Sequence, residues 1–199
     1  MLDRIPEVAG VELDLSAYSD AYDAAYRDIV FWKLERSQSF REPGVPSWEA
    51  FAAGDWERAL ELNERERDAV AAKVAEDGSL GVESRRVRVV EKPVTPYLQW
   101  EMQYFRLLAE AGEDLRVVDA VRVRHLEQSR LLPEVVVLGD SVLFEVLYDA
   151  DGTPYGARRI DDAKVIAETG KEIAGLYDRG EPLLDYFQRE IAPLPPPTV

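Results

Sequence analysis

The chain has 199 residues, carries a formal net charge of −15, and contains no cysteine and one histidine. The absence of cysteine excludes disulfides, thiolate chemistry and cysteine-ligated zinc or iron–sulfur sites. Hydrophobic residues make up 46% of the chain and charged residues 32%, and this composition predicts one domain over residues 1–199. No apolar run is long enough to predict a membrane segment. Residues 1–6 do not resemble a secretory leader, so we expect a cytoplasmic protein.

Residues 1–82 are predicted to form a helical N-terminal region that contains one strand. Aromatic and β-branched side chains in residues 29–36 favour the strand. Apolar side chains at helical spacing, preceded by residues that can cap a helix, favour the helices. The expected helices cover residues 16–29 with Ser16 as the cap, a short segment from Ser47 to Gly54, and a longer one over about 55–76.

Residues 83–160 are predicted to form the core of the sheet, and residues 85–91 are its clearest strand. Val87 and Val89 alternate there with Arg86 and Arg88. Because successive side chains of a strand point to opposite faces, the two valines should face one way and the two arginines the other.

The next elements predict a parallel crossover followed by a hairpin. An apolar helix over residues 96–111, capped by Thr95 and ended by Gly112, should be buried, with Trp100 in the core. It leads to a second strand at 115–118, so the strand–helix–strand unit should be parallel and right-handed. The sheet should be completed by a hairpin of residues 135–138 and 142–148 and by an edge strand near 155–160.

Residues 161–192 are predicted to form two C-terminal helices, at about 162–178 and 181–191, before a Pro-rich tail at 193–199. The expected fold class is therefore α/β (mixed α+β). A central mixed sheet of five or six strands would be flanked by helices, with the helical N-terminal region at one end of the chain and the two helices at the other.

The sequence contains no recognisable catalytic or metal-binding motif. His125 is the only histidine, so a histidine-based zinc site would lack ligands. No glycine-rich phosphate loop and no GxSxG motif occurs. The segment from Asp149 to Gly152 opens like a calcium loop but has Ile160 at the twelfth position, which favours a turn. We therefore predict no catalytic residue, no metal site and no cofactor.

A basic strip is the first candidate site, and it comprises Arg86, Arg88 and Arg116 together with Tyr97 and Glu101. In open α/β sheets, ligands bind at the carboxyl ends of parallel strands beside helix N-termini. The strip can bind a phosphate, a carboxylate or an acidic peptide. The alternative is that its arginines form structural ion pairs, with Glu101 and Glu145 as the candidate acids.

An aromatic group is the second candidate site. Trp48, Phe51 and Trp56 lie near a loop that is rich in proline and glycine. They can form an exposed patch that binds a protein partner. The alternative is that they pack a helical layer onto the core.

Several segments resemble an uncharacterised actinobacterial family, a domain of unknown function that is often encoded near helix-turn-helix regulators. The resemblance covers about residues 30–170, and its motifs occur in the same order. It implies a fold and no activity. This chain differs at residues 137–140, where family members carry a more aromatic strand. The motifs are Ser47-Trp48-Glu49-Ala50-Phe51, residues 86–90, Pro93 with Tyr97 and Glu101, residues 111–116, and Tyr148-Asp149.

The predicted architecture is also similar to a degenerate half of a phospholipase D-like domain. The catalytic signature of that fold, HxKxxxxD, is missing, because Glu127 stands where the lysine would follow His125. The resemblance therefore implies a fold without the phosphodiesterase chemistry.

These observations lead to two hypotheses. The first is a non-enzymatic interaction or regulatory protein that binds a protein partner, such as a helix-turn-helix regulator, or forms a homodimer. The second is a sensor or enzyme that binds a small anionic ligand through the basic strip. The net charge of −15 opposes direct binding to nucleic acid, since such binding draws on basic side chains that neutralise phosphates.

Overall fold

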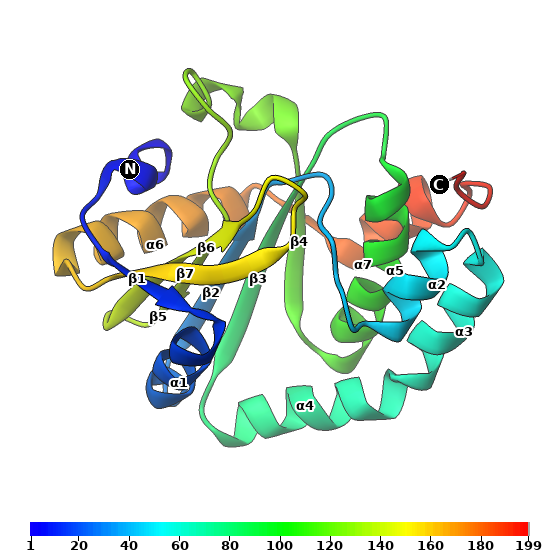
Figure 1. The fold of residues 1–199 in the computed structure, drawn as a ribbon, viewed down its shortest axis with the longest axis horizontal. Helices are drawn as coiled ribbons and strands as arrows, with labels where there is room; N and C mark the ends of the chain where they lie inside the picture. Colours follow the sequence, from blue (N-terminus) through cyan, green and yellow to red (C-terminus); the bar gives the residue numbers. More distant parts are fainter. Residues whose placement is uncertain (199) are drawn as a thin grey trace.

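Three parallel strands form the centre of the sheet in the computed structural model, which describes residues 1–198 (Figure 1). They are β2 (Val30–Glu35), β3 (Glu83–Val90) and β4 (Asp114–Asp119), and β3 pairs in parallel with both of the others. The expected parallel crossover from β3 to β4 is thus confirmed. Its helix, α5, covers Pro96–Ala111 as predicted, with Thr95 accepting from Leu98 N at 3.1 Å.

Antiparallel strands extend this centre on both sides. The full order is β1-β7-β6-β5-β2-β3-β4-β8. The expected mixed sheet is confirmed. It has eight strands among the described residues rather than five or six, since the short edge strands β1 and β8 were not apparent in the sequence. The antiparallel strands are β5 (Val135–Leu138), β6 (Val142–Tyr148), β7 (Pro154–Ile160), β1 (Val11–Asp14) and β8 (Glu181–Pro182). Strand β7 is not an edge strand, because β1 pairs with its outer side.

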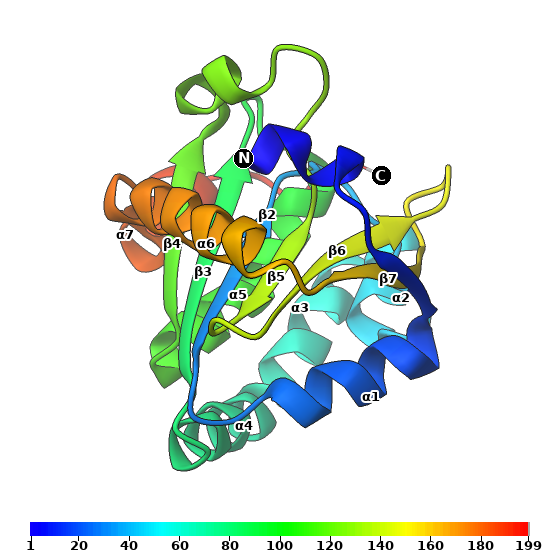
Figure 2. The same ribbon diagram turned by 90° about the vertical axis from the view of Figure 1, so that its left-hand side faces the viewer.

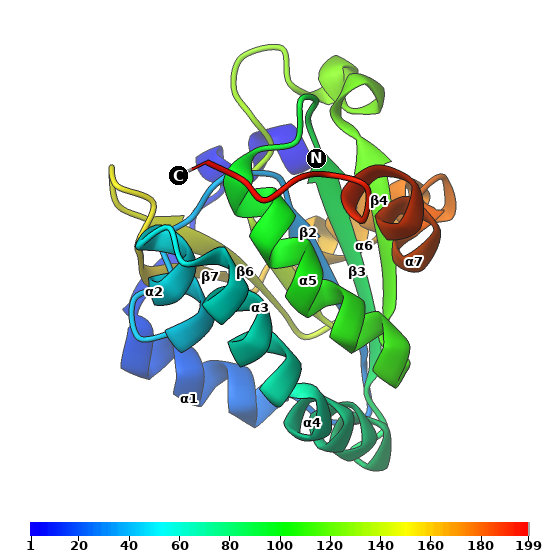
Figure 3. The ribbon, with the colours of Figure 1, turned by 90° about the vertical axis from the view of Figure 1, so that its right-hand side faces the viewer.

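Helices cover both faces of the sheet (Figures 2 and 3). One face carries α6 (Ala163–Asp178) and the 3-10 helix η1 (Leu2–Glu7), which pack on Val87 and Val89. The other face carries α1 (Leu15–Ala25), α5 and α7 (Leu183–Tyr186). Helices α2 (Pro46–Ala52) and α3 (Trp56–Arg65) lie beside α5, and α4 (Arg67–Ser79) lies at its C-terminal end. No helix among residues 1–198 is long and apolar enough to cross a membrane.

Several element boundaries differ from the sequence-based expectation. The helix expected over 55–76 is two helices, α3 and α4, that meet at Glu66. Neither glycine nor proline marks this bend, so the sequence gives no local signal for it. Helix α1 is capped by Asp14, whose carboxylate accepts from Ala17 N at 2.9 Å, and not by Ser16. The last helix is a short α7 continued by a π-helical turn at Phe187–Ile191.

Candidate functional site

Charged side chains lie on the face of the sheet that α5 covers. Strand alternation turns Lys33 and Glu35 of β2, and Arg86 of β3, toward α5, and the parallel register places Lys33 beside Arg86. Glu35 accepts from Lys33 Nζ at 2.7 Å and from Arg86 Nη1 at 3.1 Å. Arg86 Nε also donates to Glu113 at 2.8 Å. A continuous chain of ion pairs therefore lies between the sheet and α5.

Arg88 forms a separate pair deeper in the same layer. Its side chain is completely buried, and its Nε donates to Glu101 Oε2 at 2.7 Å. Its Nη1 donates to the carbonyl of Val89 at 3.3 Å, while its Nη2 has no partner. The structure thus confirms Glu101 as the acid that pairs with Arg88.

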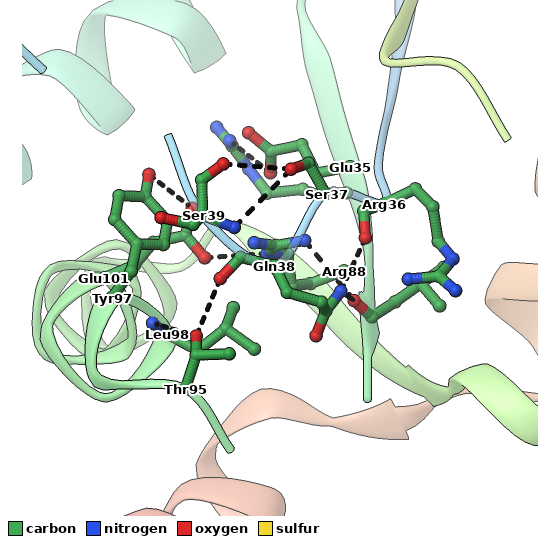
Figure 4. A network of polar contacts seen from close by, with 12 residues as sticks. Glu35, Arg36, Ser37, Gln38, Ser39, Arg88, Thr95, Tyr97, Leu98 and Glu101 are labelled. Carbon is green, nitrogen blue, oxygen red and sulfur yellow. Dashed lines mark hydrogen bonds and ion pairs between the residues drawn. The ribbon is translucent and has the colours of Figure 1, made fainter. Parts of the chain in front are cut away.

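The Tyr97 hydroxyl lies between two carboxyl groups. It is 3.1 Å from Glu101 Oε1 and 3.0 Å from Glu42 Oε1. Tyr97 and Glu101 are one helical turn apart, so they share a face of α5 (Figure 4). Glu42 comes from the loop between β2 and α2. Residues far apart in the sequence therefore meet at this hydroxyl.

Gln38 ties the segment after β2 to the segment after β3 (Figure 4). Its side chain donates to Val89 O at 2.9 Å and accepts from Glu91 N at 2.7 Å. Its backbone carbonyl accepts from Thr95 Oγ1 at 2.7 Å. Since Thr95 caps α5, these bonds set the start of the helix against the loop that carries Glu42.

A cavity of about 550 Å³ lies beside this charged layer, and we call it the α5 cavity. The sheet forms its floor, α5 one wall, and the start of α2 and the end of α3 the other. Aromatic side chains of α5 and charged side chains of the sheet both reach it. Its lining includes Lys33, Glu35, Glu42, Ser47, Leu62, Asn63, Arg65, Glu66, Arg86, Tyr97, Trp100, Glu101, Tyr104 and Phe105.

Two side chains of this lining have a buried N–H donor without a partner in the described chain. Trp100 is 5% exposed and Asn63 is 3% exposed. Trp100 Nε1 and Asn63 Nδ2 make no hydrogen bond. Buried polar groups in proteins are nearly always hydrogen-bonded. Both nitrogens have almost no accessible surface, so a water or a bound molecule could reach them only after nearby side chains move.

The charged layer shifts the pKa values of its carboxyl groups in opposite directions. Burial acts to raise the pKa of Glu35, but the charges of Lys33 and Arg86 outweigh it and lower that pKa to about 2. Burial raises the pKa of Glu42 above its usual range, against the hydrogen bond from Tyr97. Glu35 is therefore firmly ionised, whereas Glu42 keeps its proton to higher pH than an ordinary glutamate.

The structure does not bring the whole basic strip together. Arg86, Tyr97 and Glu101 line the cavity and Arg88 lies beneath it. Arg116 instead pairs in register with Val87, so it points to the α6 face. There its guanidinium stacks on Tyr177 at 5.1 Å.

Two further expectations are resolved by the packing. Glu145 does not pair with the strip, because β6 pairs with β7 rather than β3, and its partner is Arg158. His125 lies exposed in a short 3-10 helix and does not line the cavity. Among residues 1–198, no group of three or more candidate ligands could hold a metal ion.

The aromatic group packs onto the core. Phe51 is 5% exposed and stacks on Trp100, with ring centroids 5.9 Å apart. Trp48 and Trp56 are half-buried against the same cluster. These three side chains therefore attach α2 and α3 to α5 and do not form one exposed patch.

Sequence reasoning missed part of the site. Lys33 and Glu35 alternate in β2 as Arg86 and Arg88 do in β3, and charges that recur at every second position of a central strand were the available signal. No comparable signal marks Glu42 or Asn63, which reach the cavity from a loop and from an outer helix.

The chain belongs to the family described as "Domain of unknown function (DUF6879)", whose model matches residues 20–188. The expected membership of an uncharacterised family is thus confirmed. No curated protein matches the chain. Among solved structures, a phospholipase D family member, Nuc from Salmonella typhimurium, is similar with a TM-score of 0.45 and 10% sequence identity, over 83% of this chain and 90% of that chain.

Proposed function

We propose that the protein binds a small organic molecule in the α5 cavity. The observation that carries the proposal is the cavity itself, in which aromatic side chains of α5 and charged side chains of the sheet meet around one enclosed volume.

The size and lining of the α5 cavity support the same proposal. Its volume of about 550 Å³ lies within the range of roughly 300–1,000 Å³ that is typical of small-molecule sites. Aromatic side chains such as Trp100 and Phe105 offer apolar contact, and a few charged groups offer orientation. This combination of apolar walls with a few convergent polar groups is typical of ligand pockets.

The charges of the cavity bear on the hypothesis of an anion site. Arg86 donates to Glu35 and Glu113, so its charge is largely compensated within the protein. An anion bound by the arginines would have to compete with these carboxylates. We therefore retain the hypothesis of a small ligand but do not assign the arginines the role of binding an anion.

A cavity-blocking variant tests the proposal. Leu62 lines the cavity from α3, so Leu62→Trp should fill it without removing a charge. Leu60→Trp makes the same change on the same helix outside the lining and is the matched control. Thermal-shift screening against a library of small amines, alcohols and carboxylates should find compounds that stabilise the wild type and Leu60→Trp only. Compounds that stabilise Leu62→Trp equally, or a library without any hit, would overturn the proposal.

Binding of a protein partner remains a second proposal, and the free edge of β1 favours it. Among residues 1–198, strand β1 pairs with β7 alone, and the nearby side chains of Leu15 and Tyr155 are each 51% exposed. An edge strand beside exposed apolar groups can accept a strand from a partner, from a helix-turn-helix regulator or from a second copy. A pull-down with wild-type and Leu15→Lys baits tests this, and retention of every partner by the variant would exclude this edge.

A further inference from the structure

The contacts of Tyr97 require one proton more than its hydroxyl supplies. A tyrosine hydroxyl carries a single hydrogen and can donate to one acceptor only. Its oxygen nevertheless lies 3.0 Å from Glu42 Oε1 and 3.1 Å from Glu101 Oε1. Both contacts are hydrogen bonds only if one carboxyl group is protonated and donates to the tyrosine oxygen.

Glu42 is the carboxyl group that holds this proton. Arg88 Nε donates to Glu101 at 2.7 Å and favours its ionised form. No basic side chain among the described residues forms an ion pair or hydrogen bond with Glu42, whose side-chain partner is Tyr97. Burial raises the pKa of both carboxyl groups, so the assignment to Glu42 rests on the ion pair that Glu101 makes with Arg88 and Glu42 lacks.

We infer that the ligand of the α5 cavity is a small organic cation, an amine or guanidinium compound, whose positive group replaces the proton held between Glu42 and Tyr97. This inference rests on the proposed function and names its ligand class. The exchange breaks no covalent bond other than the O–H bond of the Glu42 carboxyl. Its proton leaves to solvent, and the carboxylate that remains accepts from the ammonium or guanidinium group.

The charge balance of the lining supports a cation. The acids Glu35 and Glu113 are occupied by Lys33 and Arg86, and Glu101 is occupied by Arg88. Within the cavity, Glu42 is thus the half-buried carboxyl group without a basic partner. A cationic ligand supplies that partner.

The aromatic wall supports the same ligand class. Tyr97, Trp100 and Tyr104 line the cavity from α5, and a cation over an aromatic ring gains electrostatic attraction. We therefore expect a ligand whose positive group lies beside this aromatic wall and Glu42.

Other charged and titratable groups face Glu42 and will set the pH at which the exchange occurs. They come from every element around the cavity and carry both signs. They are Lys33 and Glu35 of β2, Arg86 of β3, Arg65 of α3, Glu66 between α3 and α4, Tyr97, Glu101 and Tyr104 of α5, and Tyr148 of β6.

Three probes of similar shape and different charge test the inference: 2-phenylethylamine, 2-phenylethanol and 3-phenylpropionate. Isothermal titration calorimetry on the full chain should show that the amine binds best, by about tenfold or more, as expected for a charge-assisted hydrogen bond. Because the proton and the amine compete for Glu42, amine affinity should rise as the pH increases through the raised pKa of Glu42. The binding enthalpy should vary with the buffer in the sense of proton release.

Matched variants locate the effect. Glu42→Gln keeps an acceptor for Tyr97 and should remove both the preference for the amine and its pH dependence. Tyr97→Phe, which keeps the ring, replaces Glu42→Gln as the test if that variant folds poorly. It should weaken the pH dependence of amine binding. Glu49→Gln makes the same change at an exposed site on α2 outside the lining and should leave binding unchanged.

The outcomes separate this inference from the proposed function. If the alcohol or the carboxylate binds as tightly as the amine, and Leu62→Trp abolishes that binding, the cavity is a ligand site and the cation assignment is wrong. The cation assignment is equally wrong if Glu42→Gln binds the amine as the wild type does. If none of the three probes binds, the inference fails, and the library screen decides whether the proposed function stands.

Discussion

Replacement of Arg88 by methionine tests whether the buried ion pair under α5 stabilises the fold. Arg88 is completely buried, and its Nε donates to Glu101 at 2.7 Å. Removing one partner leaves the other charge buried without compensation, which costs about 3–5 kcal/mol. Methionine retains much of the volume of the arginine stem, so a cavity contributes little. For a chain of this length, we expect the melting temperature to fall by roughly 10 °C.

Urea denaturation followed by circular dichroism measures the effect, within a double-mutant cycle that includes Glu101→Gln. Each single variant leaves an unpaired partner, whereas the double variant leaves none. The double variant should therefore cost less than the sum of the two by about 1–3 kcal/mol. Arg85→Met is the matched control, because Arg85 lies on the same strand with a side chain that is 37% exposed. It should cost no more than about 1 kcal/mol.

Two results would contradict this expectation. A loss below about 1 kcal/mol for Arg88→Met would mean that the charge is hydrated or mobile rather than buried and paired. Additive losses in the cycle would mean that Arg88 and Glu101 act independently. Either result would also weaken the assignment of the cavity proton to Glu42, because that assignment relies on Arg88 keeping Glu101 ionised.

Four further predictions concern the core, acid stability, the pairing of β7 with β1, and helix α6. Trp100→Ala should lower the free energy of unfolding by about 3–5 kcal/mol, because the ring is 5% exposed and stacks on Phe51; a change below about 1 kcal/mol in urea titrations would contradict this. The pKa of Glu35 is lowered to about 2 in the fold, so its stabilisation is complete above the pKa of the unfolded chain and is lost as pH falls toward 2. Acid titration of Glu35→Gln should lack this loss of roughly 3 kcal/mol. Gly156→Ala should destabilise β7 by about 1–3 kcal/mol, because its Cβ would overlap the carbonyl oxygen of Leu13. Gly170→Ala, which has open space in α6, should stabilise by up to about 1 kcal/mol in the same thermal melts.

The α5 helix shows how much of the fold could be predicted from local sequence. Thr95 as the cap, Pro96 at the first position and Gly112 in the left-handed conformation set its two ends, and the structure has all three. These signals act within one helical turn, so no knowledge of the remaining chain is needed. The break at Glu66 carries no such signal, and the continuous apolar pattern over 55–76 predicted one helix where the structure has two.

The candidate site likewise has residues whose placement the sequence predicted and residues whose placement it did not. Period-two alternation in residues 85–91 predicted that Arg86 and Arg88 share a face, where they would either meet carboxylates or line a cleft. Arg88 meets Glu101 there. The sequence does not fix the register between β3 and β4, and that register turns Arg116 toward α6.

Local patterns in the chain therefore specify the class of the fold, the caps of its main helices and the buried charge of its central strand, because each depends on residues within a few positions of one another. Which distant side chains meet is set by packing alone. The loop that carries Glu42 reaches Tyr97 across a separation of 55 residues, and α3 brings Asn63 to the same cavity. Such meetings depend on the placement of whole elements, and a contact between loop and helix leaves no periodic mark on either segment.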